Sequence, residues 1–182
     1  MNPRRILISG VAGSGKTTLA KAVAATTGLP LIDVDEFMWL PGWVEVPHDE
    51  QRRRVDQLTQ QLEWVMDTAY GRWKDIPESR AELIVCLDYA RWLSFLRLLR
   101  RTVARAIDRQ PCCNGNVESW KMIFSKNSIL LWHFRTFERK RRRARTWAQD
   151  PTKTVIILNH PREAEQWLAS LIPSDAQPST DS

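Results

Sequence analysis

Three glycines, a lysine and a threonine occupy residues 10–17 in the pattern G-x-x-x-x-G-K-T. An apolar run over residues 4–9 precedes the pattern and predicts a buried strand, and good helix formers over residues 16–27 follow it. Glycines let backbone N–H groups converge on phosphate oxygens, and the N-terminus of the following helix adds partial positive charge. The arrangement therefore predicts a Walker A phosphate-binding loop between the first strand and the first helix.

The polar side chains of this loop have separate expected tasks. Lys16 can reach the β- and γ-phosphates of a nucleoside triphosphate, and the hydroxyl of Thr17 can ligate Mg²⁺. ATP and Mg²⁺ are therefore the cofactors that the loop implies. The residues expected to contact the nucleotide are Gly10, Gly13, Ser14, Gly15, Lys16, Thr17 and Thr18.

The rest of the chain alternates between strand and helix patterns. Further strands are expected at residues 29–35, 64–67, 82–88 and 154–160. Further helices are expected at residues 49–63, 91–109, 117–126, 128–149 and 162–171, and Gly28 is expected to end the first one. This alternation predicts an α/β fold with a five-stranded, mainly parallel sheet and helices on both faces. The length of 182 residues favours one domain, and residues 173–182 are expected to be a disordered tail.

The net charge is confined to one segment. The chain carries 27 Lys and Arg against 21 Asp and Glu, and residues 135–145 alone hold seven basic residues and one acid, which accounts for the whole net charge of +6. Such a cluster either binds phosphate groups in a site or forms an electrostatic footprint for nucleic acid. Nucleic acid is the less favoured partner, because no helix-turn-helix or other nucleic-acid-binding motif accompanies the cluster.

Cysteine usage and hydropathy restrict the cellular setting. Cys86, Cys112 and Cys113 are too few and too irregular for a disulfide framework, and the adjacent pair does not have metal-ligand spacing. No apolar run approaches the ~20 residues that cross a bilayer, and residues 1–10 lack the apolar region and cleavage site of a signal peptide. We therefore expect a cytoplasmic protein with no membrane partner.

Carboxylates follow the predicted strands. Asp33 and Asp35 lie two residues apart and, at strand period, point to the same side, where a carboxylate can accept a proton from an acceptor hydroxyl. Either residue could instead cap the next helix. Asp67 and Asp88 end two further strands, and each is placed as a second carboxylate on the magnesium side of a nucleotide site. Asp88 could equally be a turn residue.

Residues 4–171 resemble, in order and spacing, the P-loop kinases of the adenylate kinase-like type, and most closely the group known as DNA topology modulation proteins. The segments that carry the resemblance are GVAGSGKTTLAKAVA, LIDVDEFMWLPGW, WVMDTAY, LIVCLDYARW and the arginine-rich helices after them. The resemblance implies a P-loop NTPase fold with a mobile helical lid at about residues 110–145, in a single kinase-like domain over residues 1–172. It also implies ATP-dependent phosphoryl transfer to a small acceptor.

The resemblance further implies roles for the carboxylates. In the similar shikimate and gluconate kinases a D-x-D pattern orients the acceptor hydroxyl and magnesium, and Asp33 and Asp35 match it. The nearer family more often has only the second aspartate, which favours Asp35 as the catalytic one. The strand order of the family favours Asp67 over Asp88 as the magnesium ligand beside the loop threonine. His160 follows the last strand, where related kinases place the adenine-side loop, and is a pocket candidate.

Arginines on two helices complete the expected site. Arg97 and Arg101 match the R-x-x-x-R after the fourth strand of adenylate kinase-like proteins, which implies nucleotide contact for Arg97 and a catalytic role for Arg101. On the helix over residues 128–149, Arg135, Arg139 and Arg142 share one face and resemble the lid arginines of the family. Guanidinium groups bind phosphate in two-pronged fashion, so Arg139 and Arg142 are expected to neutralise the transferring group. The expected catalytic roles do not account for Arg141, Arg143 and Arg145. The expected catalytic residues are Lys16, Asp35, Arg101, Arg139 and Arg142.

One departure from the family pattern bears on which acceptor the chain uses and on whether it is an active kinase. Where the family commonly has Asp-Gly-Asn-Tyr, residues 67–70 read Asp-Thr-Ala-Tyr, and Thr68 adds a Cβ where substrate or backbone approaches closely. The expected function is ATP- and Mg²⁺-dependent phosphorylation of a nucleoside monophosphate or a small hydroxylated metabolite. The alternatives are a nucleotide-binding regulator that contacts DNA through residues 135–145, and an ATP-binding protein without kinase activity.

Overall fold

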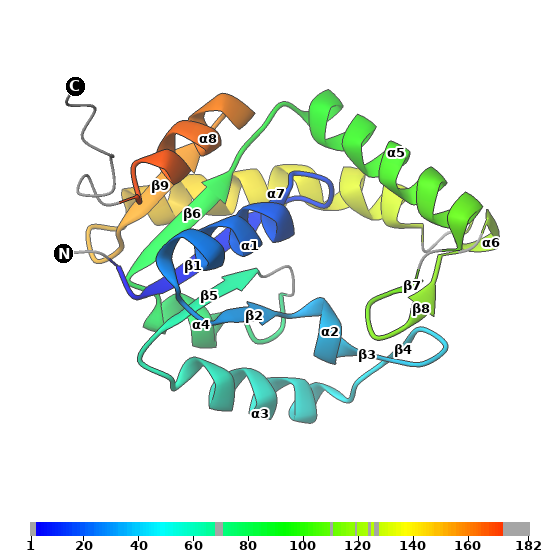
Figure 1. Cartoon of the computed structure of the whole chain (residues 1–182), viewed down its shortest axis with the longest axis horizontal. Coiled ribbons are helices and arrows are strands. Elements are labelled where there is room, and N and C mark those ends of the chain that lie inside the picture. Colours follow the sequence, from blue (N-terminus) through cyan, green and yellow to red (C-terminus); the bar gives the residue numbers. More distant parts are fainter. Residues whose placement is uncertain are drawn as a thin grey trace, which may run out of the picture.

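The computed structural model describes residues 3–67, 71–109, 111–118, 120–123, 125 and 128–172. Five strands form a parallel sheet in the order β2-β5-β1-β6-β9 (Figure 1). The prediction of a five-stranded parallel sheet is therefore confirmed. The strands of this sheet are β1 (Arg5–Gly10), β2 (Leu31–Asp33), β5 (Trp64–Asp67), β6 (Leu83–Leu87) and β9 (Val155–Leu158).

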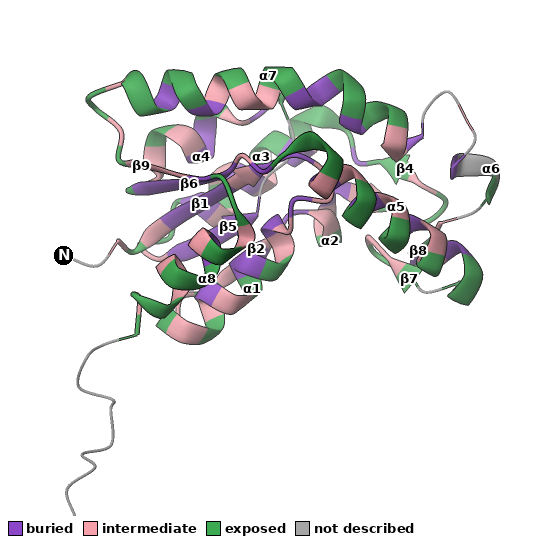
Figure 2. Ribbon diagram, turned by 90° about the horizontal axis from the view of Figure 1, so that it is seen from above, coloured by how far each residue is buried: buried purple, intermediate pink, exposed green. Residues whose placement is uncertain are grey.

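Helices cover both faces of the sheet (Figure 2). On one face, α1 and α8 pack against Ile6 and Ile8 of β1, and on the other face α3, α4 and the C-terminal half of α7 pack around Leu7. Successive side chains of a strand point to opposite faces, so these three neighbours contribute to two separate cores. The main helices are α1 (Lys16–Thr27), α2 (Asp35–Met38), α3 (His48–Thr59), α4 (Asp75–Arg80), α5 (Arg91–Asp108), α7 (Ile129–Gln149) and α8 (Pro161–Ala169).

The carboxyl ends of the central strands meet at one edge of the sheet. Asp33 at the end of β2 lies in register with Asp67 at the end of β5, and Gly10 at the end of β1 lies in register with Leu87 of β6. In open parallel sheets this edge is where ligands bind. The fold therefore brings the start of the predicted phosphate loop and two of the predicted carboxylates to the same edge.

The bounds predicted for the first helix are confirmed. The helix α1 covers residues 16–27, and Gly28 follows it with a φ of 74° while its N–H donates to the carbonyl of Ala24 at 2.9 Å. A left-handed residue that satisfies a terminal carbonyl is how many helices end, and glycine adopts it without strain.

The predicted end of the next long helix, at residue 63, is wrong. The helix α3 ends at Thr59, and Leu62, within the predicted range, is 78% exposed. The carbonyl of Thr59 accepts a hydrogen bond from the indole of Trp64 at 3.3 Å, and the hydroxyl of Thr59 accepts one from Arg80 at 2.6 Å. These contacts satisfy the helix end, so the chain leaves early and enters β5.

The prediction of a helix over residues 117–126 is confirmed over Trp120–Ile123 and is wrong at Val117, Glu118 and Ser125. Residues 111–117 form a hairpin of β7 (Pro111–Cys112) and β8 (Asn116–Val117), and the described helix is limited to α6 (Trp120–Ile123). The turn of this hairpin has positive φ at Cys113, Asn114 and Gly115. A second short hairpin, β3 (Trp39–Leu40) with β4 (Val44–Glu45), and the helices α2 and α4 were not predicted.

Two further expectations concern the outer parts of the chain. Residues 173–182 lie outside the described residues. The range of the expected lid, about 110–145, contains the β7–β8 hairpin, α6 and most of α7. Within the described ranges, no helix combines the length and the apolar character needed to cross a membrane.

Candidate active site

The glycine-rich loop runs from the end of β1 to the start of α1, and two of its glycines are required by the backbone. Gly13 has a φ of 79° and Gly15, the residue before α1, has a φ of 95°. A Cβ at Gly13 would collide with the carbonyl oxygen of Ser94 and would lie 2.7 Å from Cβ of Leu98. The loop is therefore seated against α5, a contact between distant segments that sequence reasoning missed.

The side chains of the loop are held inside it. Lys16 is buried, and its ammonium group donates to the carbonyl of Val11 at 3.2 Å. The hydroxyl of Ser14 is also buried, and it has no hydrogen-bond partner in the part of the chain that the structure describes. A buried polar atom without a partner is costly in a protein core, and a bound anion would relieve that cost. The glycine-rich loop thus offers the polar groups that a phosphate-binding site needs.

Asp67 joins this loop from β5. Its carboxylate accepts a hydrogen bond from the hydroxyl of Thr17. Burial raises the pKa of Asp67, and the charges of Asp35 and Asp33 raise it further, whereas Lys16 and the Thr17 hydroxyl lower it. The two residues that the sequence analysis predicted as magnesium ligands are therefore adjacent, although they are 50 residues apart in the chain.

The predicted D-x-D pair has two different local environments. The carboxylate of Asp33 accepts a hydrogen bond from the backbone N–H of Asp35 at 3.3 Å and lies 3.6 Å from the ammonium of Lys21. Burial raises the pKa of Asp33, and the neighbouring charge of Asp35 adds to this. Asp33 therefore has the contacts of a turn-forming residue at the start of α2, while Asp35 begins that helix.

Arg97 and Arg101 lie one turn apart on α5, and their guanidinium groups have different surroundings. The guanidinium of Arg97 lies over the ring of Tyr89, 5.8 Å from its centroid, and its Nη1 would lie 4.0 Å from a Cβ at Gly15 of the loop. Arg101 is accessible to solvent, yet desolvation and the charge of Arg105 lower its pKa.

The carboxylates of Glu118 and Asp35 raise the pKa of Arg101, so this guanidinium stands near the carboxylate predicted to bind the acceptor.

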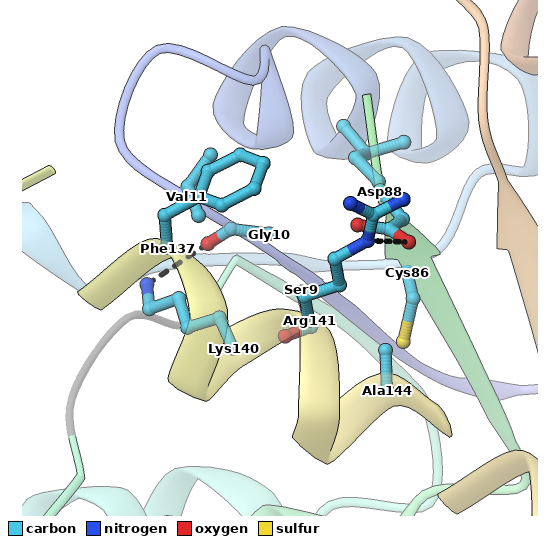
Figure 3. A pocket seen from close by; sticks show the side chains of 10 residues that line it. Ser9, Gly10, Val11, Cys86, Asp88, Phe137, Lys140, Arg141 and Ala144 are labelled. Atoms are coloured by element: carbon cyan, nitrogen blue, oxygen red, sulfur yellow. Dashed lines mark hydrogen bonds and ion pairs between the residues drawn. The ribbon is translucent and has the colours of Figure 1, made fainter. Parts of the chain in front are cut away.

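The basic residues of α7 point in several directions. Arg141 donates to the carboxylate of Asp88 at 3.1 Å, as Figure 3 shows, and Arg143 lies 3.8 Å from the carboxylate of Glu78. The side chains that are exposed are those of Arg135, Arg139, Arg142 and Arg145. The basic segment is therefore divided among ion pairs, solvent and the site, and does not form one continuous charged surface.

Lys140, which the sequence analysis did not select, reaches the phosphate loop from α7. Its ammonium donates to the carbonyl of Gly10 at 2.9 Å (Figure 3). Together with Gly10, Asp88 and Arg141 it lines a small cavity between α7 and the ends of β1 and β6. A signal for Lys140 does exist in the sequence, because it shares the helical phase of the buried residues Phe137, Ala144 and Trp147.

Two remaining candidates have simple outcomes. The imidazole of His160 accepts a hydrogen bond from the N–H of Arg162 at 3.2 Å and so caps the N-terminus of α8. Thr68 lies outside the described residues.

The hairpins β3–β4 and β7–β8 lie side by side at the end of the molecule beyond α2 (Figure 1), and hydrogen bonds join them. The side chain of Asn116 accepts from the N–H of Trp43 at 2.8 Å and donates to the carbonyl of Leu40 at 3.0 Å. The indole of Trp43 donates to the carbonyl of Val117 at 3.0 Å, and Asn114 donates to the carbonyl of Trp39 at 2.9 Å. We call this set of contacts the hairpin clasp.

A glycine-rich loop between β1 and α1, at the carboxyl edge of a parallel sheet with this strand order, defines a P-loop NTPase fold. Residues 6–67 match the family model described as ATPase family associated with various cellular activities (AAA). This segment runs from β1 to Asp67 and so includes both the loop and its carboxylate. Among curated protein sequences, no match was found.

Solved structures narrow the fold to that of the small P-loop kinases. A gluconokinase from Sinorhizobium meliloti 1021 is 20% identical with a TM-score of 0.54, and the match covers 93% of each chain. A shikimate kinase from Bacteroides thetaiotaomicron is 17% identical with a TM-score of 0.56, covering 93% of this chain and 97% of that one. A sugar kinase from Janibacter sp. HTCC2649 is 17% identical with a TM-score of 0.53, covering 94% and 99%.

Proposed function

We propose that this protein is an ATP- and Mg²⁺-dependent P-loop kinase of the adenylate kinase-like type that phosphorylates a small acceptor. The observation that carries the proposal is the contact between Thr17 of the loop and Asp67 of β5, beside Lys16. A hydroxyl and a carboxylate from two separate elements meet where a triphosphate on the loop would end. Phosphoryl transfer needs this combination, because its catalysis consists largely of positioning and of neutralising charge.

The loop would hold the triphosphate, and Thr17 and Asp67 would hold Mg²⁺. The residues fit these ligands, since both magnesium-side groups are oxygen donors and the buried hydroxyl of Ser14 has no partner among the described residues. Mg²⁺ neutralises charge between the β- and γ-phosphates when it is bound. In the described part of the chain no cluster of three or more His, Cys, Asp and Glu could hold a metal ion. Nucleotide oxygens and water would therefore complete the coordination.

The remaining roles follow from position along the edge. Lys16 would exchange the carbonyl of Val11 for phosphate oxygens, and Arg97, next to Gly15, would contact the phosphates from α5. Asp35 would orient the acceptor hydroxyl and accept its proton. Arg101 would bind negative charge on the acceptor or on the transferring group. Arg139 and Arg142 are exposed, so they would contribute only if residues 110–145 closed over the site as a lid.

The acceptor is proposed to be a nucleoside monophosphate or a small hydroxylated metabolite. The names of the similar gluconokinase, shikimate kinase and sugar kinase structures support a hydroxylated metabolite. The proximity of Arg101 to Asp35 supports an acceptor that carries an anionic group as well as a hydroxyl. The finer resemblance to the DNA topology modulation proteins fits the same site and adds no acceptor of its own.

Acceptor-dependent release of ADP tests the proposal. The purified protein with ATP and Mg²⁺ would be screened against nucleoside monophosphates, sugars and sugar acids, and Lys16→Ala would be the matched control. We expect turnover with at least one acceptor class and its loss in the variant. Nucleotide binding without transfer to any acceptor would instead identify an ATP-binding protein without kinase activity, and normal turnover by Lys16→Ala would contradict the assignment of the loop.

A further inference from the structure

We propose that Lys140 of α7 is a second phosphate-binding lysine, which moves from the carbonyl of Gly10 to the terminal phosphate when a nucleoside triphosphate occupies the loop. This inference deepens the proposed function and rests on it for the catalytic role, whereas its binding role requires only that the loop takes a nucleotide.

The first observation is where the two lysines of the site end. Lys140 donates to the carbonyl of Gly10 at 2.9 Å, and Lys16 donates to the next carbonyl, that of Val11, at 3.2 Å. Two ammonium groups from different helices therefore donate hydrogen bonds to two consecutive carbonyls at the start of the loop. Backbone carbonyls bind an ammonium more weakly than anionic oxygens do, so both are available to a phosphate.

The second observation is a charge imbalance. Burial lowers the pKa of Lys140 well below its usual range, the charge of Lys16 lowers it further, and the charge of Asp67 raises it. Arg143 and Arg139 on its own helix also lower it. The charge of Lys16 also acts on Asp67, whose carboxylate is itself bonded to Thr17. An excess of positive charge in a buried site is unfavourable until an anion binds there.

The third observation is the orientation of α7. Phe137, Ala144 and Trp147 are buried, and Lys140 lies in the same stripe, three residues after the first and four before the second. Successive residues of a helix are about 100° apart around its axis. The stem of a lysine can lie along apolar neighbours while its head reaches a polar group. Arg139 and Arg142 are turned away from the stripe and are exposed, so Lys140 is the cation of α7 that packing directs at the loop.

A purely structural role is the competing explanation, in which Lys140 only pins Gly10 and holds α7 to the loop. The two roles differ in what they demand of the charge. A pin needs a hydrogen-bond donor, whereas a phosphate-binding residue needs a cation that senses the γ-phosphate. Three substitutions separate these demands. Lys140→Met removes both properties, Lys140→Gln keeps a donor without the charge, and Lys140→Arg keeps the charge.

The experiment compares binding of Mg-ADP with binding of a non-hydrolysable Mg-ATP analogue by titration calorimetry, with thermal unfolding of each variant. We expect Lys140→Met and Lys140→Gln to weaken the ATP analogue about 10- to 100-fold, which is the range of a lost charged hydrogen bond, and ADP by less than about 3-fold. Lys140→Arg, which keeps the charge, should bind the ATP analogue nearly as tightly as the wild type does. Arg145→Met, an exposed cation on the same helix with no role in the site, should leave both affinities unchanged.

Equal loss of ADP and ATP-analogue binding, or unchanged binding in Lys140→Gln, would overturn the proposal in favour of a structural pin. If Lys140→Met does not fold, the Gln and Arg variants carry the test. The outcome is independent of the acceptor screen. A loss of ATP-analogue binding that exceeds the loss of ADP binding in the Lys140 variants would support the proposal even if no acceptor were phosphorylated. Where turnover is found, Lys140→Gln should lower kcat more than it raises KM for ATP.

Discussion

Trp43 and Asn116 are 73 residues apart in the chain, and the backbone N–H of Trp43 donates to the side-chain oxygen of Asn116 at 2.8 Å. The same Asn116 amide donates to the carbonyls of Leu40 and Cys113, so one buried side chain satisfies three backbone groups from two hairpins. The hairpin clasp therefore has a single central residue.

Replacing Asn116 by Ala should open the hairpin clasp. Each backbone group left without its partner costs about 1–3 kcal/mol when it stays buried, so we expect the hairpins to separate rather than to keep the packing. Hydrogen–deuterium exchange over residues 39–45 and 111–117 measures this separation. Asn114→Gly, which removes one exposed hydrogen bond to Trp39 and tolerates the positive φ of this position, is the control and should change exchange much less. Unchanged protection in Asn116→Ala would contradict a clasp.

Asp67→Asn should stabilise the nucleotide-free protein while it disables the site. Burial raises the folded-state pKa of Asp67 above its ordinary value of 3.8, so its contribution to stability is greatest at low pH and is lost as the pH rises through the folded pKa. An amide keeps the contact with Thr17 without a buried charge. We expect a higher Tm than wild type at neutral pH, no gain at pH below 3.8, and a loss of turnover of about 100-fold or more.

Asp88→Asn provides the contrast for that result. The carboxylate of Asp88 pairs with Arg141 outside the loop, so the change should lower Tm rather than raise it, because it weakens an ion pair. Equal effects of the two substitutions on Tm would argue against burial as the cause of the Asp67 shift.

Gly13→Ala should loosen the contact between the loop and α5. The new Cβ would meet the carbonyl of Ser94 and the side chain of Leu98, and the φ of 79° disfavours any residue with a Cβ. Strain and overpacking together should cost about 2–4 kcal/mol in urea unfolding. Gly115 has the same φ but open space around it, so Gly115→Ala should cost only about 1 kcal/mol. Similar costs for both would mean that α5 does not constrain the loop.

Arg97 and Arg101 should separate the nucleotide and acceptor sides of the site. Arg97 lies next to Gly15 of the loop, whereas Arg101 lies near Asp35. We therefore expect Arg97→Met to raise KM for ATP about 10-fold and to leave KM for the acceptor nearly unchanged, and Arg101→Met to do the reverse. Steady-state kinetics with either substrate varied would reveal the pattern. If both variants affected the same substrate, the proposed division along α5 would be wrong.

Local patterns predicted the central elements well. The extent of α1, its end at Gly28 and the five strands follow from apolar runs, helix formers and glycine, all of which act over a few residues. The elements that were not predicted depend on distant partners. The hairpins β3–β4 and β7–β8 are held by Trp43 and Asn116, and the early end of α3 at Thr59 by Trp64 and Arg80.

The sequence by itself determined that this chain has a phosphate-binding loop between a strand and a helix, because a glycine-rich turn before a helix binds anions through its own backbone. Only the tertiary structure decided which cation of the basic segment meets that loop. The packing of Phe137, Ala144 and Trp147 against the rest of the protein sets the rotation of α7, and that rotation directs Lys140 inward and leaves Arg139 and Arg142 in solvent.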